Sequence, residues 1–110
     1  MPTCIADEKP VFVHAVYFWL HDHVTVGQKT EFMELLKTFK KIKSVKSVLV
    51  GPPAGTPRTV VDNSYDVALI VEFRDKAGHD YYQQDKIHTD AIKIFEGWIK
   101  ELKIYDMVNY

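Results

Sequence analysis

The stretch "VFVHAVYFWL", residues 11–20, is apolar at nearly every position and rich in β-branched and aromatic side chains. This length and composition are typical of a β-strand that is covered on both faces. Alternate positions of a strand point to opposite faces, so the stretch divides into two apolar rows. The rows are Phe12, Val16, Phe18 and Leu20 on one side and Val13, Ala15, Tyr17 and Trp19 on the other. The fold must therefore cover both sides of this strand.

An amphipathic helix is predicted after the strand, over residues 26–41. Thr25 and Gln28 match a capping box, in which the hydroxyl accepts from an early helix amide and the glutamine reaches back. The apolar positions that follow recur at helical spacing. They are Phe32, Leu35, Leu36 and Phe39, with Met33 beside them.

The remaining chain adds three strands and two helices. Residues 44–51 form a short strand that stops at Gly51-Pro52-Pro53, and residues 51–64 form a surface loop. Residues 65–75 alternate as a strand with two faces. One face carries Tyr65, Val67, Leu69, Val71 and Phe73, and the other carries Asp66, Ala68, Ile70, Glu72 and Arg74. Asp75 caps a short helix through Gln84, a second helix follows, and residues 103–110 close the chain as a strand. The second helix is predicted from one apolar stripe, made of Ile87, Ala91, Ile94, Phe95, Trp98, Ile99 and Leu102.

This element order predicts an α+β fold, the ferredoxin-like β-α-β-β-α-β sandwich of four antiparallel strands. Two helices cover only one face of such a sheet, which leaves the second apolar row of the first strand exposed. Large exposed apolar patches mark interaction surfaces. We therefore expect a homodimer that joins sheet to sheet in a dimeric α+β barrel. In the alternative, the C-terminal strand and the loop fold over that face.

The overall composition narrows the class of protein. A chain of 110 residues with 46% hydrophobic side chains suits one domain, predicted over residues 11–110, after a leader at residues 1–10. The net charge of -1 provides no basic face for nucleic acid. The single cysteine, Cys4, cannot form an internal disulfide, which favours a reducing compartment. No secretory signal or membrane-length apolar run is recognised, so we expect a cytoplasmic protein without membrane contact.

Four segments resemble a known family, the stress-responsive A/B barrel (Dabb) domain. They are "FVHAVYFWLHD", "VGQKTEFMELL", "SYDVALIVEFRD" and "YYQQDKIHTDAIKIF", in this order, and the resemblance covers residues 11–108. It implies a dimeric α+β barrel, in agreement with the apolar face that lacks a cover.

The resemblance also implies a site. The family includes the plant polyketide cyclase that forms olivetolic acid, whose working tyrosine and histidine match Tyr82 and His88, while His14 matches a further pocket histidine. Its cavity lining corresponds to Val16, Phe18, Phe32, Met33, Leu36 and Leu69. Asp85-Lys86 replaces a common His-Pro pair. Ala91 and Leu36 stand where the cyclase has phenylalanine and tyrosine, so a cavity of different shape with fewer polar groups is expected.

The chemistry of Tyr82 and His88 fits such a site. An imidazole accepts a proton near neutral pH, and a phenol donates a hydrogen bond to an enolate oxygen. Six positions on one unbroken helix place two side chains about 240° apart, so the pair converges only if the helix breaks near Asp85. We expect that break, with the helix start lowering the pKa of His88. In the alternative, Tyr82 and His88 are packing residues and His14 is a hydrogen-bonded core residue.

Other motifs carry weaker signals. "HDH", residues 21–23, has metal-binding residue types but no further ligand at useful spacing, so we interpret it as a loop and predict no metal and no cofactor. Three functions remain open: a protein that binds a small apolar or aromatic ligand, a cofactor-free cyclase-like lyase or isomerase, and a haem-binding α+β barrel protein with His88 as ligand. The sequence does not decide whether the protein is an enzyme.

Overall fold

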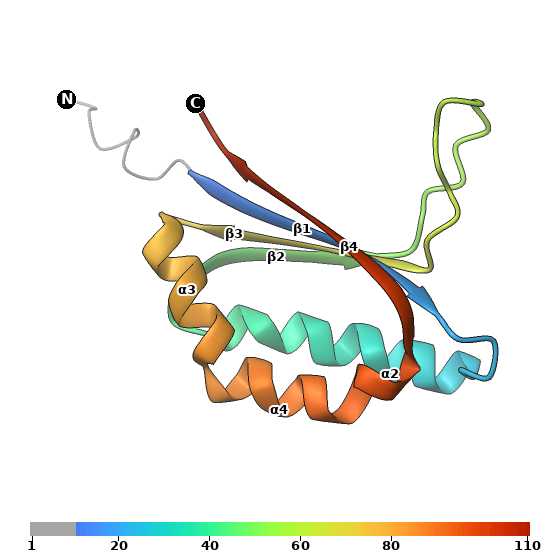
Figure 1. Ribbon diagram of the computed structural model, residues 1–110, viewed down its shortest axis with the longest axis horizontal. Coiled ribbons are helices and arrows are strands. Elements are labelled where there is room, and N and C mark those ends of the chain that lie inside the picture. The colour runs from blue at the N-terminus through green and yellow to red at the C-terminus, as the bar shows by residue number, and fades with distance from the viewer. Residues whose placement is uncertain (1–10) are drawn as a thin grey trace.

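The apolar stretch at the start of the chain forms an inner strand of a four-stranded antiparallel sheet, seen in a computed structural model (Figure 1). The structure describes residues 11–110, so the predicted leader at residues 1–10, with Cys4, lies outside the described residues. The strands are β1 (Phe12–Leu20), β2 (Val45–Gly51), β3 (Val67–Phe73) and β4 (Ile99–Val108). Their order in the sheet is β2-β3-β1-β4. β1 therefore has a hydrogen-bonded neighbour at each of its two edges.

The helices lie together on one face of this sheet (Figure 1). They are α2 (Val26–Lys37), α3 (Lys76–Gln84) and α4 (Lys86–Phe95), with short 3-10 turns η1 (Thr38–Lys41) and η2 (Glu96–Trp98). The predicted capping box is present: Thr25 accepts from the Gln28 amide, and the Gln28 side chain accepts from the Thr25 amide. This arrangement confirms the ferredoxin-like α+β fold. Among the described residues no helix has both the length and the apolar character needed to span a bilayer.

Two of the boundaries that differ from the prediction change the assignment of apolar residues. The last helix ends at Phe95, so Ile99 and Leu102 belong to β4 and not to a helical stripe, and Ile94 is 51% exposed. Apolar residues at 98, 99 and 102 fit a helix and a half-buried strand equally well, which is why the pattern alone placed the boundary wrongly. Tyr65 lies outside β3, and its ring contacts Tyr17 on the helix-free face at a centroid distance of 5.1 Å. Because Tyr65 precedes the strand, the alternation that places Val67 and Leu69 on the helix-covered face does not apply to it.

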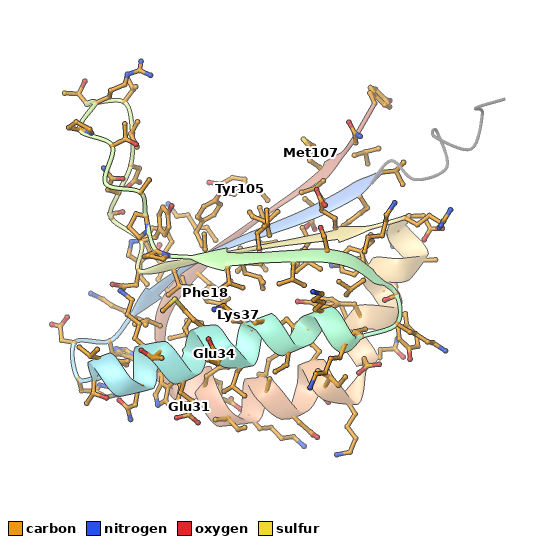
Figure 2. The ribbon with its side chains drawn as sticks, turned by 180° about the vertical axis from the view of Figure 1, so that it is seen from behind. Phe18, Glu31, Glu34, Lys37, Tyr105 and Met107 are labelled. Carbon is orange, nitrogen blue, oxygen red and sulfur yellow. The ribbon has the colours of Figure 1, made fainter. Side chains whose placement is uncertain are left out.

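The core lies between the sheet and the helices. Phe32 of α2 is fully buried, with its ring edge-on to Phe18 of β1 at 5.0 Å and to Phe95 of α4 at 4.7 Å. Figure 2 shows Phe18 pointing from the sheet toward α2, while Glu31, Glu34 and Lys37 follow α2 on its outer side. The aromatic contact of three elements fixes α2 and α4 against the sheet.

The opposite face of the sheet has no cover within the described residues. Tyr105 and Met107 of β4 lie on this side (Figure 2) and are 61% and 55% exposed. Because residues paired across antiparallel strands share a face, they continue the second apolar row of β1. The apolar residues of the helix-free face are Val13, Ala15, Tyr17, Trp19, Leu49, Ala68, Ile70, Tyr105 and Met107, and the same pairings place Ser47, Glu72, Glu101 and Lys103 beside them. β4 extends the sheet beside β1 and does not fold over it, which contradicts the alternative in which this strand covers the face.

We predict that Phe32→Ala lowers the free energy of unfolding by about 3–5 kcal/mol, because it leaves a cavity between three elements. Val26→Ala on the same helix is the control. Val26 is 84% exposed, so its truncation is expected to change stability by less than about 0.5 kcal/mol. Urea unfolding of both variants measures the difference. Equal effects of the two truncations would contradict the described packing of α2.

Candidate functional site

A cavity of about 330 Å³ lies between the sheet and the helices. Most of its lining is apolar and comes from β1, β3, α4 and β4. The lining residues are His14, Val16, Phe18, Leu36, Phe39, Leu69, Tyr82, Gln83, His88, Ile92, Phe95, Glu96, Ile99, Leu102 and Ile104. Small-molecule sites are typically concave and largely apolar with a few polar groups, and this cavity has that character.

The register of β1 and β4 positions the first polar group. His14 pairs directly with Asp106, so both side chains lie on the helix-covered face. His14 Nδ1 lies 2.6 Å from Asp106 Oδ1, and a carboxylate only accepts, so Nδ1 carries the proton and Nε2 is the free acceptor. Burial lowers the pKa of His14, while the hydrogen bond and charge of Asp106 act in the opposite direction. Hence His14 is a neutral imidazole of defined tautomer.

A break between α3 and α4 brings Tyr82 and His88 together. Asp85 is extended, with φ −67° and ψ 141°, and it ends α3 and caps α4 by accepting from the Ile87 amide. Figure 1 shows α3 descending from the sheet edge and α4 turning beneath the sheet. The rings of Tyr82 and His88 are 4.5 Å apart and both line the cavity. The predicted break is confirmed, and it removes the 240° separation that one continuous helix would impose.

The environment of His88 favours the neutral imidazole. Burial is the largest cause that lowers its pKa, and nearby His14 and His79 act in the same direction. A hydrogen bond to the Gln83 backbone and the charge of Asp85 oppose this shift. The predicted direction agrees, but desolvation is the leading cause rather than the helix start. His88 Nδ1 is buried without a hydrogen-bond partner within the described part of the chain.

Tyr82 provides a hydrogen-bond donor at the cavity wall. Its side chain is 1% exposed, and burial raises the pKa of the phenol well above its ordinary value. The phenol therefore stays protonated at neutral pH. Next to it stands the neutral imidazole of His88. Together they offer one donor and one acceptor to a bound molecule.

The structure gathers most of the predicted site residues but not all of them. His14, Tyr82 and His88 line the cavity together with Val16, Phe18, Leu36 and Leu69. Phe32 and Met33 do not line it. Phe32 packs against Phe18 and Phe95, and Met33 is half-buried against the core. A helix directs only one stripe of side chains at a given point, and in α2 this stripe reaches the cavity through Leu36.

Three polar residues near the site were missed from the sequence. Gln83 and Glu96 line the cavity, and Asp106 holds His14. Asp106 is the one acid in the segment "KIYDMVNY", and Glu101, the other acid of β4, lies on the opposite face. An inward acid on a strand, in register with an inward histidine, is the signal that could have identified it.

The comparisons agree with this architecture. The model of the Dabb family, the stress responsive A/B barrel domain, matches residues 12–109. The chain belongs to the Dabb family. No curated protein matches it.

Solved structures similar to this Dabb chain share its fold. A Dabb family protein from Mesorhizobium loti is 17% identical, with 93% of this chain and 99% of that chain covered and a TM-score of 0.71. A dimeric ferredoxin-like protein of unknown function from Thermobifida fusca is 20% identical, with 91% and 92% covered and a TM-score of 0.77. A hydroxynitrile lyase from Passiflora edulis is 13% identical, with 93% and 96% covered and a TM-score of 0.79. At these identities the likeness shows the fold alone.

We predict that Asp85→Ala costs about 1 kcal/mol of the free energy of unfolding, because the Ile87 amide loses its acceptor at the start of α4. Asp85→Asn retains a capping oxygen and is expected to remain close to the wild-type protein. Chemical denaturation of the two variants measures the cap. If asparagine is as costly as alanine, the cap is not the origin of the effect.

Proposed function

We propose that this Dabb protein binds a small aromatic compound with a hydroxyl group in the cavity between the sheet and the helices. The observation that carries the proposal is the buried Nδ1 of His88, which has no partner among the described residues and belongs to a residue of the cavity wall. A buried polar atom without a partner costs roughly 1–3 kcal/mol, and with the ring proton on Nε2 the Nδ1 atom accepts from a ligand hydroxyl, which removes that cost.

The remaining wall defines the rest of the ligand. Phe18, Phe39 and Phe95 provide aromatic contacts, and Leu36, Leu69 and Ile104 provide aliphatic ones. A volume of about 330 Å³ is near the lower limit for small-molecule sites. This favours a compact aromatic ring with a short alkyl chain. The Tyr82 phenol supplies a donor for a second oxygen of the ligand.

A matched pair of probes tests the polar contact. We expect 4-propylphenol to bind more tightly than 4-propylanisole, by about 2- to 10-fold, since the ether lacks the hydroxyl that donates to His88. His88→Phe is expected to remove this preference while the fold is retained. Titration calorimetry provides the affinities. Equal affinities of the two probes for the wild-type protein would contradict the proposed role of His88.

A second pair of variants tests the location. Ile104→Trp is expected to block the cavity and weaken binding of 4-propylphenol at least about tenfold, because Ile104 lines it and is half exposed. Ile94→Trp is the control, since Ile94 is exposed to the same degree but does not line the cavity. Unchanged binding in Ile104→Trp would place the site elsewhere.

A cofactor-free cyclase-like activity is the second candidate function. The neutral imidazole beside a protonated phenol favours it. In this reaction His88 takes a proton from the carbon next to a carbonyl, and Tyr82 donates a hydrogen bond to the enolate oxygen. The enolate carbon then attacks a second carbonyl of the same molecule, and the imidazolium returns the proton to the new alkoxide. The balance requires no oxidant.

Loss of deuterium from phenylacetone labelled beside its carbonyl tests the first step separately from binding. We expect the wild-type protein to accelerate the exchange and His88→Gln to lose the acceleration. Binding of 4-propylphenol without any exchange would support the ligand-binding function and exclude this proton abstraction.

We also propose that the helix-free face joins two copies of the chain. The face carries apolar side chains from all four strands, beside the polar residues Ser47, Glu72, Glu101 and Lys103, and the neighbour from Thermobifida fusca is described as dimeric. A specific interface of standard size buries about 800 Å² per partner. Such an interface would cover Tyr105 and Met107, which a monomer exposes to water.

Sedimentation at micromolar concentration is expected to give twice the chain mass of 12.7 kDa. Leu49→Lys combined with Met107→Lys is expected to give monomers, because both residues lie on the helix-free face. Val26→Lys combined with Ile94→Lys places the same charges on exposed helix positions and is expected to leave the mass unchanged. A wild-type monomer would refute the interface.

A further inference from the structure

A cluster of ligand-type side chains lies beside the cavity. His14 of β1, His79 of α3 and Asp106 of β4 can each offer one ligand atom, and these atoms lie within 4.8 Å of one another. Their positions in the sequence are 65 and 27 residues apart, so no short motif connects them. We propose that His14, His79 and Asp106 bind a divalent transition-metal ion, for which Zn²⁺ is the best match.

The ligand chemistry selects the class of metal. Two imidazoles and a carboxylate suit Zn²⁺ and the later first-row metals, whereas Mg²⁺ and Ca²⁺ prefer sets made of oxygen ligands. The single carboxylate offsets part of the charge of the ion. Three protein ligands also match the usual number at zinc sites that keep a position for water or another ligand.

The geometry needs only small adjustments. Zinc bonds of about 2.0–2.2 Å place tetrahedral ligand atoms roughly 3.3–3.5 Å apart. His14 Nδ1 and Asp106 Oδ1 are 2.6 Å apart, so an ion between them replaces their hydrogen bond and separates them slightly, while the ring proton moves from Nδ1 to Nε2. The Asp106 side chain is 40% exposed and can rotate into solvent space. Separations of up to 4.8 Å must in turn contract, and the partly exposed Asp106 side chain has the freedom to move toward the two imidazoles.

The surroundings hold His79 in place beside His14. Its ring stacks on Phe12 at 4.9 Å, lies edge-on to Phe73 at 5.6 Å and is 4.8 Å from the His14 ring. Within residues 11–110 its nitrogens form hydrogen-bond contacts with two exposed side chains, Nδ1 with Asp80 at 3.4 Å and Nε2 with Gln83 at 3.2 Å. Coordination therefore displaces one long, solvent-accessible contact. The apolar rings limit the motion of the imidazole, as in sites whose ligands are oriented by their neighbours.

An ion at the cluster would lie at the wall of the cavity, because His14 belongs to both. This inference is independent of the proposed aromatic ligand, since the three side chains are close together whether or not the cavity is filled. It departs from the expectation of no metal, which rested on sequence spacing. The exposed loop histidines His21 and His23 stack at 5.3 Å but are absent from the described metal-type cluster.

Titration with ZnCl₂ and with CoCl₂ tests the proposal on the wild-type protein. We expect about one ion per chain and, with Co²⁺, visible d–d absorption of a low-coordinate site. Asp106→Asn and His79→Gln are each expected to weaken Zn²⁺ binding at least tenfold. His21→Gln combined with His23→Gln is the matched control and is expected to bind as the wild type does.

A thermal melt separates loss of the site from loss of the fold. We expect Zn²⁺ to raise the Tm of the wild-type protein and of the loop control but not that of His79→Gln, since an ion stabilises only the state that binds it. In the presence of a metal chelator, the His79→Gln variant is expected to show a single cooperative thermal unfolding transition, which indicates that its fold is intact. Absence of Zn²⁺ binding by the wild-type protein, or its loss in the loop double variant alone, would overturn the proposal.

Discussion

The structure depends on a strand that is apolar on both faces. β1 directs Val16 and Phe18 toward the helices and Tyr17 and Trp19 to the opposite side. Burying only one row leaves the other in water, at roughly 25 cal/mol for each Å² of apolar surface left exposed. The helix layer on one side of β1, which lies between β3 and β4 in the sheet, covers the first row. The second row belongs to the apolar face that we assign to a second copy of the chain.

The second constraint is the break at Asp85. Asp85, in extended conformation, ends α3 and caps α4. The change of direction between the two helices brings the rings of Tyr82 and His88 together. The cost is a lost helical turn, which the cap on the Ile87 amide offsets in part. The family resemblance predicted His-Pro at this point in related chains. Here Asp85 stands at this point and caps α4 by accepting from the Ile87 amide.

The polar groups in the apolar cavity have different roles because their partners differ. His14 has a carboxylate partner and a defined tautomer, whereas His88 Nδ1 is buried without one in the described residues. An unpartnered buried polar atom is a cost to the folded protein, and a hydrogen bond with a bound ligand removes that cost. The raised pKa of Tyr82 keeps a donor beside that atom.

Local pattern was sufficient for the strands, the helix caps and the apolar rows, because periodicity and capping depend on residues near in sequence. It identified the Thr25 box, the Asp75 cap and the break at Asp85. The end of the last helix was not predictable in this way, since Ile99 and Leu102 suit either element. Met33 and Leu36 differ in their access to the cavity only because α2 has a particular rotation against the sheet.

What the sequence determined by itself was therefore the element order, the buried row of β1 and the family resemblance, which named Tyr82, His88 and His14. Tertiary structure alone decided that Asp106 meets His14, that His79 joins them, and that Phe32 belongs to the core rather than to the cavity wall. The physical reason is strand register and helix docking. These set distances between residues far apart in the chain, and no local periodicity encodes them.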